Sequence, residues 1–163
     1  MKRFILIVVF ASVLAGNIFA GSNDNLGLGT VFYGGYGYGP GIVLKLPAIP
    51  LYWGLNVSVR GIPDKQYFGV SISGDYHFFD QALPNTEIFN WFLGSGIIYT
   101  HSHFDGKNGL SARIPLGVYF SPSQKFDVIL ELSPQAGFYA SANFSKVDFD
   151  YGMSGLLGVR YWF

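Results

Sequence analysis

The stretch around His77 is the first whose residue types and spacing suit chemistry. It places Ser71, Ser73, Asp75 and His77 at alternate positions, so a β-strand would carry all four side chains on one face. A hydroxyl, a carboxyl and an imidazole are the groups that hydrolases with a serine nucleophile combine. However, the stretch matches no motif of a lipid-modifying enzyme, whose site an acyl chain must reach. We therefore interpret His77 as a buried histidine with hydrogen-bond partners, and we predict that the protein is not an enzyme.

A second candidate is the HxHxD segment made by His101, His103 and Asp105. Alternate histidine and aspartate side chains on an extended segment can ligate one metal ion. These residues fall in a predicted loop, where exposure to solvent explains them equally well, so we predict no metal site. The glycine-rich segment 34–39 has no helix after it and therefore predicts a hairpin turn, not a phosphate-binding loop. No cofactor is expected.

The pattern of residues at the end of the chain indicates that β-strands carry these candidate residues. Counting back from Phe163 in steps of two gives only apolar residues and glycine as far as Phe149, whereas most residues between them are small or polar. Side chains alternate between faces along a strand, so this pattern predicts one long strand with an apolar and a polar face. Similar alternation recurs along the chain between glycine and proline breaks. It predicts eight strands: 26–33, 40–46, 51–60, 66–79, 87–100, 109–120, 125–138 and 148–163.

The two faces of these strands differ in charge. No charge occurs on one face, which carries residues such as Leu110, Ile114 and Val118, while the other combines serine and glycine with the strand charges. A lipid-facing Arg or Lys near the bilayer midplane costs roughly 2–4 kcal/mol. The charged face should therefore turn toward a closed lumen. It includes Arg60, Asp75, His77, Arg113, Asp127, Glu131, Arg160 and Lys45.

An eight-stranded barrel has an interior that its own side chains can fill. Buried charges require partners. We therefore predict that the three arginines, the two aspartates, the glutamate and His77 form a hydrogen-bonded ion network that plugs the lumen and fixes the register of the strands. The functional alternative is a gated pore or a proton path through the same residues.

Composition also favours a membrane protein. Half of the 163 residues are hydrophobic and only 12% are charged, compared with about 25% in soluble domains. No segment after residue 20 is apolar for long enough to be a transmembrane helix, which leaves a closed barrel as the way to pair all backbone groups in hydrocarbon. We predict an all-β fold, an eight-stranded antiparallel up-and-down transmembrane β-barrel. A soluble lipocalin-like barrel, with its apolar face inward, is the rival interpretation.

The N-terminus predicts export. Lys2 and Arg3 precede an apolar run over 4–14, and small residues lead to a cleavage site after Ala20. We predict a signal peptide over 1–20, a barrel over 21–163 and an outer-membrane location. No cysteine follows the apolar run, which argues against a lipoprotein anchor. The ten basic and ten acidic residues balance, so no binding to nucleic acid is expected.

An even number of strands places both ends of the barrel in the periplasm. The expected outer loops are then 34–39, 61–65, 101–108 and 139–147, while 47–50, 80–86 and 121–124 become periplasmic turns. Exposed loops on a rigid scaffold are the usual place for recognition. Aromatic residues near the strand ends, Tyr33 and Phe78 among them, are expected to form girdles at the two membrane interfaces.

The chain resembles the small OmpA/OmpX-type outer-membrane barrels over about residues 26–163, through its strand count, its alternation and its terminal Tyr161–Trp162–Phe163. This resemblance implies that Tyr161 and Phe163 belong to the assembly signal recognised by the barrel-assembly machinery, and that outer-membrane lipid surrounds the protein. Two shorter stretches, Gly27–Leu28–Gly29 and 47–54, resemble an uncharacterised family of small spirochaetal outer-membrane barrels. Members of that family have been associated with binding host complement regulators.

These observations predict a small outer-membrane protein with a structural role, or with a surface-interaction role in which its outer loops bind host surface or serum proteins. The alternative functions are a narrow channel and a lipid-modifying outer-membrane enzyme.

Overall fold

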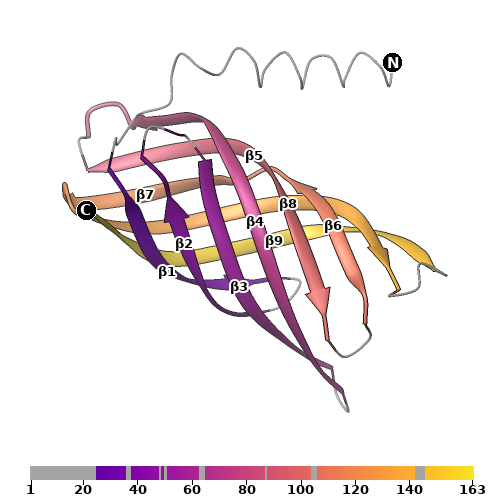
Figure 1. Ribbon diagram of the computed structural model, residues 1–163. Helices are drawn as coiled ribbons and strands as arrows, with labels where there is room; N and C mark the ends of the chain where they lie inside the picture. Colours follow the sequence, from indigo (N-terminus) through magenta and orange to yellow (C-terminus); the bar gives the residue numbers. More distant parts are fainter. Residues whose placement is uncertain are drawn as a thin grey trace, which may run out of the picture.

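The computed structural model describes residues 25–35, 38–47, 49, 51–62, 65–86, 88–103, 106–141 and 146–163. The regular structure in these ranges is entirely β-strand (Figure 1). The strands are β1 (Gly27–Gly34), β2 (Gly39–Lys45), β3 (Leu51–Ile62), β4 (Lys65–Ala82), β5 (Phe89–Ser102), β6 (Asn108–Arg113), β7 (Leu116–Ser123), β8 (Phe126–Ala140) and β9 (Val147–Trp162). No helix in the described ranges has the length and hydrophobicity that a membrane span needs. The predicted signal peptide, 1–20, lies outside the described residues.

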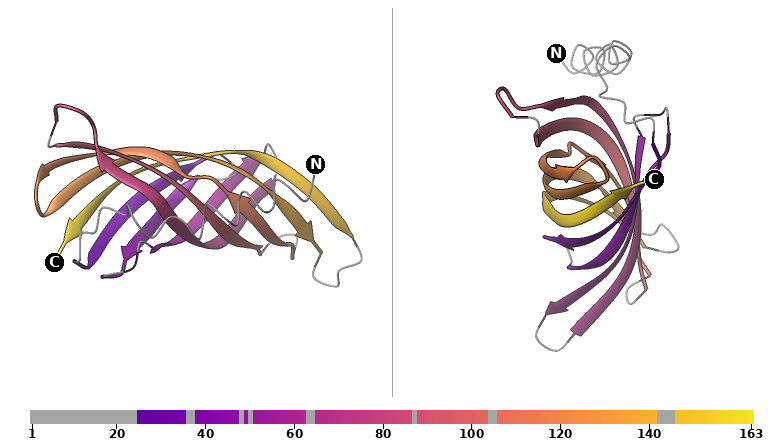
Figure 2. Two further views of the ribbon diagram at one scale, coloured as in Figure 1. Left: turned by 90° about the horizontal axis from the view of Figure 1, so that it is seen from above. Right: turned by 90° about the vertical axis from the view of Figure 1, so that its left-hand side faces the viewer.

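The strands pair in one closed antiparallel ring. From β1 to β5 each strand pairs with the next along the chain, β5 pairs with β6 and β7, and both of these pair with β8. β9 pairs with β8 and returns to β1, where Leu28 lies opposite Tyr161 and Gly34 opposite Gly155. The strands are tilted, so the two sides of the ring cross in projection (Figure 2).

β6 and β7 are two halves of one strand. They flank Ile114 and Pro115 and keep a single register against both β5 and β8. The Gly94 N–H donates to the Pro115 carbonyl at 2.8 Å, and the Ile114 N–H donates to the Pro134 carbonyl at 3.0 Å, so this segment stays in the wall. The ladder is interrupted because proline has no N–H to donate. When β6 and β7 are counted as one strand, the described ring has eight strands.

This architecture confirms the predicted fold class, an all-β ring of antiparallel up-and-down strands. Each predicted strand corresponds to an observed one, with β6 and β7 together matching the predicted strand 109–120. The main differences in length lie at β4 and β7, which end at Ala82 and Ser123 instead of 79 and 120. Both continue because their hairpin partners keep pairing with them, and Ala82 still lies opposite Asn90.

Side chains alternate between the two faces of the wall. On β1, Val31 and Tyr33 are 5% and 6% exposed, whereas Phe32 between them is 54% exposed. The exposed strand residues whose side chains are described include no Lys, Arg, Asp or Glu. The buried ones include Lys45, Asp75, Asp80, Arg113, Asp127, Glu131 and Arg160. The charges of the described strands therefore point into the ring, and large apolar side chains cover its outside.

A bulge in β4 corrects one of the predictions. The pairing with β5 passes from His77 to Phe79 and leaves Phe78 without a partner. Asp80 then turns inward and is 6% exposed, although the segment 80–86 was expected to be a turn. One extra residue in a strand shifts the alternation by one position. A strict two-residue pattern therefore cannot place Asp80 in the lumen.

Tyr33 corrects a second prediction, because it was expected in an interfacial girdle and lies in the lumen instead. Glycines on the neighbouring strands leave room for its ring. A Cβ built on Gly41 would lie 2.8 Å from Tyr33 Cε2, and one built on Gly54 would lie 2.8 Å from the Tyr33 hydroxyl. Gly27 leaves room for Trp162 in the same way, since a Cβ there would lie 2.8 Å from the indole. Inward glycines thus define where the large lumen side chains fit.

Two glycines of β9 test this packing. An added Cβ at Gly158 would lie 2.7 Å from the Thr30 carbonyl oxygen and 3.0 Å from Val31 Cα, whereas at Gly155 its nearest neighbour is Leu132 Cδ2 at 3.6 Å. We expect Gly158→Ala to lower the free energy of unfolding by about 1–3 kcal/mol, because the backbone of β1 must shift. Gly155→Ala should change it by less than about 0.5 kcal/mol. Urea titration of the refolded protein in detergent, followed by tryptophan fluorescence, measures both values, and equal losses would contradict this account.

Candidate functional site

The lumen contains the predicted charged residues. Asp75 and His77 lie on β4, Arg113 on β6, and Arg160 on β9, all of them buried. Asp127 and Glu131 lie on β8 and are 2% and 7% exposed. The remaining predicted residue, Arg60, pairs through its backbone with Tyr67 in the β3–β4 ladder, but its side chain lies outside the described residues.

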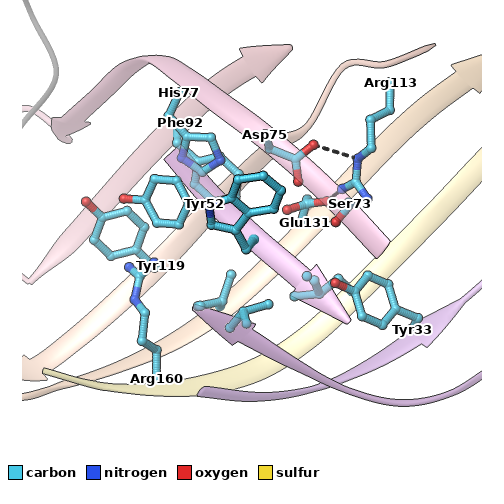
Figure 3. Close-up of a pocket in the computed structure, with 15 residues that line it drawn as sticks. Tyr33, Tyr52, Ser73, Asp75, His77, Phe92, Arg113, Tyr119, Glu131 and Arg160 are labelled. Carbon is cyan, nitrogen blue, oxygen red and sulfur yellow. Dashed lines mark hydrogen bonds and ion pairs between the residues drawn. The ribbon is translucent and has the colours of Figure 1, made fainter. Parts of the chain in front are cut away.

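Arg113 joins two carboxylates on the inner face of the wall. Its Nε lies 3.2 Å from Asp75 Oδ1, and its Nη2 donates to Glu131 Oε1 (Figure 3). The side chains of these three residues are less than one-tenth exposed. One guanidinium thus faces two carboxylates, so the cluster has an excess negative charge when all three groups are ionised. We call Asp75, Arg113 and Glu131 the Arg113 cluster.

Arg160 forms a second cluster with Asp127. Its Nε and Nη2 donate to Asp127 Oδ2 at 3.0 and 2.6 Å. Trp162 Nε1 donates to the same oxygen at 2.7 Å, and the Ser121 hydroxyl donates to Asp127 Oδ1 at 2.7 Å. The Lys45 ammonium lies 6.0 Å from the centre of a Trp162 ring. Both oxygens of this buried carboxylate are therefore hydrogen-bonded, which is what a charge away from water requires.

Aromatic rings surround the Arg160 guanidinium. Its Cζ lies 4.2 Å from the ring centre of Trp162, 5.2 Å from that of Tyr52 and 5.4 Å from that of Tyr119. These distances are within the range of cation–π attraction. The Tyr52 hydroxyl donates to Asp80 Oδ2 at 3.1 Å, and the Tyr119 hydroxyl donates to Asp80 Oδ1. Arg160 thereby contacts rings from β3, β7 and β9, and fills the lumen near the chain termini.

His77 lies between two aromatic rings. Its ring centre is 4.0 Å from that of Tyr52 and 4.4 Å from that of Phe92, with interplanar angles of 19° and 5° (Figure 3). Ser71, Ser73 and Asp75 share its inward face, as the alternation predicts. However, His77 Nδ1 has no hydrogen-bond partner. Stacking therefore holds the imidazole, and this nitrogen takes part in no Ser–His–Asp relay.

A small cavity lies in the lumen between the Arg113 cluster and the His77 stack. Its polar lining includes Tyr33, Ser73, Asp75 and His77, and Val43, Ile129 and Leu156 provide apolar lining (Figure 3). The space open to the centres of water-sized molecules is about 30 Å³, enough for about two waters.

The HxHxD segment forms part of the opposite end of the ring. His101 and His103 are exposed, and Asp105 lies outside the described residues. His101 Nδ1 lies 2.9 Å from Asn108 Oδ1, which also accepts a hydrogen bond from the Tyr99 hydroxyl at 2.7 Å. Within the described ranges no three His, Cys, Asp or Glu side chains group as a metal site.

The last residues close the ring. Tyr161 and Phe163 point outward with their rings edge to face at 5.0 Å, while Trp162 between them points inward. The Phe163 N–H donates to the Leu26 carbonyl at 2.9 Å. The role of Tyr161 and Phe163 as an assembly signal stays a prediction.

Sequence reasoning missed several lumen residues: Tyr33, Tyr52, Asp80, Phe92, Tyr119 and Trp162. Apart from Asp80, they stand at inward positions of the two-residue alternation. Only Tyr33 was assigned to a membrane interface because of its aromatic ring, and the prediction of the ion network considered charged residues and His77 alone. Tyr33, Phe92 and Trp162 each pack against an inward glycine of another strand, so inward glycines were the available signal for these three rings. Gly117 illustrates this, because a Cβ there would overlap the Phe92 ring.

The Arg160–Asp127 pair supports a double-substitution test. Asp127→Asn leaves the Arg160 guanidinium buried without a counter-charge, so we expect a loss of about 3–5 kcal/mol in the free energy of unfolding. Adding Arg160→Met removes that charge and should recover most of the loss. Asp148→Asn, at an aspartate whose side chain is 40% exposed, is the matched control and should cost less than about 0.5 kcal/mol. Urea titration measures all four proteins. A double variant as unstable as Asp127→Asn would show that the charge pair is not the source of the loss.

Comparison with known proteins adds information on the fold. No protein-family model matches the chain, and no curated protein matches it in sequence. Among solved structures, the N-terminal β-barrel domain of Pseudomonas aeruginosa OprF matches with a TM-score of 0.52 and 14% identity, covering 87% of this chain and 99% of that chain. The match supports the resemblance to OmpA-type barrels and gives no support to the spirochaetal family. The chain shares its fold with this β-barrel domain.

Proposed function

We propose that the protein is an outer-membrane β-barrel whose lumen is closed by its own side chains, and whose role is structural. The proposal depends first on the lipid-facing surface and second on the filled lumen. The OprF neighbour shares the fold, and the proposal extends that likeness to location and role.

The outward face of the strands is the observation that carries the proposal. Large apolar side chains are exposed on all nine strands, for example Phe32 at 54%, Leu130 at 54% and Leu157 at 58%. The exposed strand side chains that are described include no Lys, Arg, Asp or Glu. A soluble monomer rarely exposes an apolar patch of more than a few hundred Å². Hydrocarbon around the ring gives these side chains an apolar environment.

The same faces argue against the soluble rival. A lipocalin-like barrel turns its apolar face inward around a ligand and its polar face toward water. In this chain Arg113, Glu131 and Arg160 point inward, where they are at most 7% exposed. Placing this ring in water would expose a wide apolar surface and bury its charges. The membrane gives both faces a suitable environment.

The filling of the lumen supports a structural role over a channel. The Arg160 guanidinium with its three aromatic neighbours lies across one part of the interior, and the Arg113 cluster lies across another. The cavity between them admits about two waters. An eight-stranded ring has an interior about as wide as its side chains. A hydrated path through the lumen would require several of these contacts to break.

A more specific role, the binding of other molecules through the outer loops, stays a prediction. Such binding would take place at the end of the ring opposite the termini. There a carboxylate oxygen of Asp148 lies 3.8 Å from the Lys107 ammonium, and the other lies 3.4 Å from the Lys146 ammonium. These ion pairs link the β5–β6 connection to the base of the β8–β9 connection.

Insertion into a membrane gives the first test. The protein refolded in detergent should migrate faster on a gel when unheated than when boiled, and the exported protein should fractionate with outer membranes. Leu130→Arg places a charge on the outward face and should cost roughly 2–4 kcal/mol in lipid, whereas Leu130→Ala should cost less. Recovery of the folded protein in soluble periplasmic extract, or a Leu130→Arg variant as stable as Leu130→Ala, would refute the membrane assignment.

Conductance gives the second test. In planar bilayers we expect the refolded protein to show no frequent, stable single-channel openings, because the Arg113 and Arg160 clusters and the stacked rings fill the lumen. Asp127→Asn with Arg160→Met, which weakens the plug, should open more often than the unmodified protein. Regular openings of the unmodified protein, altered by Glu131→Gln, would favour the gated pore.

A further inference from the structure

A chain of aromatic contacts crosses the lumen beside the cavity. The His77 ring stacks on Tyr52 with ring centres 4.0 Å apart, and on Phe92 at 4.4 Å. Phe92 in turn contacts Tyr119, whose ring centre lies 6.2 Å away at an interplanar angle of 30°. The four side chains come from β3, β4, β5 and β7, so they connect four separate strands. We call Tyr52, His77, Phe92 and Tyr119 the aromatic layer.

Asp80 joins the two ends of the aromatic layer. The Tyr52 hydroxyl donates to Asp80 Oδ2 at 3.1 Å, and the Tyr119 hydroxyl donates to Asp80 Oδ1. The contacts therefore form a closed circuit, in which Asp80 links the first ring to the last. Each oxygen of this carboxylate has a tyrosine donor, which a carboxylate that is only 6% exposed requires.

The bulge in β4 places Asp80 in this circuit. A strict alternation from His77 would turn Phe79 inward and Asp80 outward, but the unpaired Phe78 reverses this order. Phe79 is accordingly 38% exposed, while Asp80 is buried. Bulges re-aim a side chain at the cost of a local interruption of the ladder. The irregularity in the wall is therefore what makes the contacts of Asp80 inside the lumen possible.

The aromatic layer forms one side of the cavity. Figure 3 shows its rings on one side and the Arg113 cluster on the other. The Tyr52 and Tyr119 hydroxyls point away from the Arg113 cluster, toward the side where Asp80 binds them. Along β4 this is the direction of the last residues of the strand, at the end of the ring that contains the C-terminus (Figure 1). The layer therefore separates the cavity from that end of the ring.

Arg160 lies against the same two tyrosines. Its Cζ is 5.2 Å from the ring centre of Tyr52 and 5.4 Å from that of Tyr119, within the range of cation–π attraction. Two hydrogen bonds to Asp127 fix the guanidinium itself. Each tyrosine hydroxyl, in contrast, is held by its hydrogen bond to Asp80. A movement of either ring out of the layer must therefore break the contact with Asp80.

We propose that Asp80 is a latch, which holds the aromatic layer across the lumen and keeps the cavity closed on the side of the C-terminus. Release of the two tyrosine hydroxyls lets their rings turn aside and admits water to His77 and the cavity. Such a local opening breaks only a few contacts, because the strands of the wall keep their ladder. The inference rests on the proposed function, which places this end of the ring in the periplasm, and it identifies the contact on which closure at this end depends.

Chemical labelling of His77 tests the latch on the refolded full chain. Diethyl pyrocarbonate modifies accessible imidazoles, and mass spectrometry of peptides reports each histidine separately. The chain has three histidines, of which His101 and His103 are exposed and serve as internal standards. In the unmodified protein we expect the standards to be labelled and His77, which is 5% exposed, to be labelled little. In Asp80→Ala the labelling rate of His77 should rise by about tenfold or more, because two hydrogen bonds no longer oppose local opening, while the standards keep their rates.

Two further variants separate the latch from other effects of Asp80→Ala. Tyr52→Phe combined with Tyr119→Phe keeps both rings and the charge of Asp80 but removes the two hydrogen bonds. This double variant should also raise the labelling rate of His77. Asp75→Ala is the matched control for general loss of stability, because Asp75 lies on the same strand, is 7% exposed and belongs to the opposite side of the cavity. Its effect on the rate should be much smaller.

Three results would overturn the proposal. One is fast labelling of His77 in the unmodified protein, since the layer would then not close the cavity. Another is an unchanged rate in the folded double tyrosine variant, which would show that Asp80 acts only as a counter-charge to Arg160. The third is an equal rise in Asp75→Ala, which would attribute the effect to lost stability.

Heat-modifiability on a gel checks that each variant is folded, and the double tyrosine variant decides the question if Asp80→Ala does not fold. Fractionation of the exported protein tests the membrane assignment separately. Failure of the latch is therefore distinguishable from failure of the proposed function.

Discussion

Closure of the ring between β1 and β9 is the constraint on which the rest of the structure depends. A closed antiparallel ladder has no edge, so the backbone groups of each strand find partners in the two neighbouring strands. Closure also leaves only two environments for a strand side chain, inside the ring or outside it. The distribution of charge follows from this choice, because Arg113 and Arg160 find carboxylates only on the inside. The outside is left to side chains that hydrocarbon tolerates.

The interior is organised around two arginines with different surroundings. Arg160 is matched by Asp127, whose two oxygens accept several hydrogen bonds, and three aromatic rings surround its guanidinium. Arg113 faces two carboxylates, those of Asp75 and Glu131. The Arg160 cluster joins β8 to β9, and the Arg113 cluster joins β4, β6 and β8.

Irregularities of the wall concentrate beside the Arg113 cluster. The bulge in β4 follows His77, while Pro115 interrupts the strand between β6 and β7, and Pro134 faces Ile114. Proline inside a sheet is normally confined to edges and bulges because it cannot donate to the ladder. Its presence twice in a closed ring lowers the number of ladder hydrogen bonds in this part of the wall.

The alternation of residue types determined the fold class, the number of strands and the inward position of charges such as Asp127 and Glu131, because a strand repeats every two residues whatever its neighbours. The sequence alone could not place Asp80, since the bulge that turns it inward arises from pairing between β4 and β5. Nor could it place Tyr33, because a membrane interface and a packed lumen both accept an aromatic ring. Only the tertiary structure shows which inward glycine leaves room for the rings of Tyr33, Phe92 and Trp162, and which carboxylates lie near Arg113 and Arg160. These contacts join strands that are distant in sequence, and the register across the ring decides them.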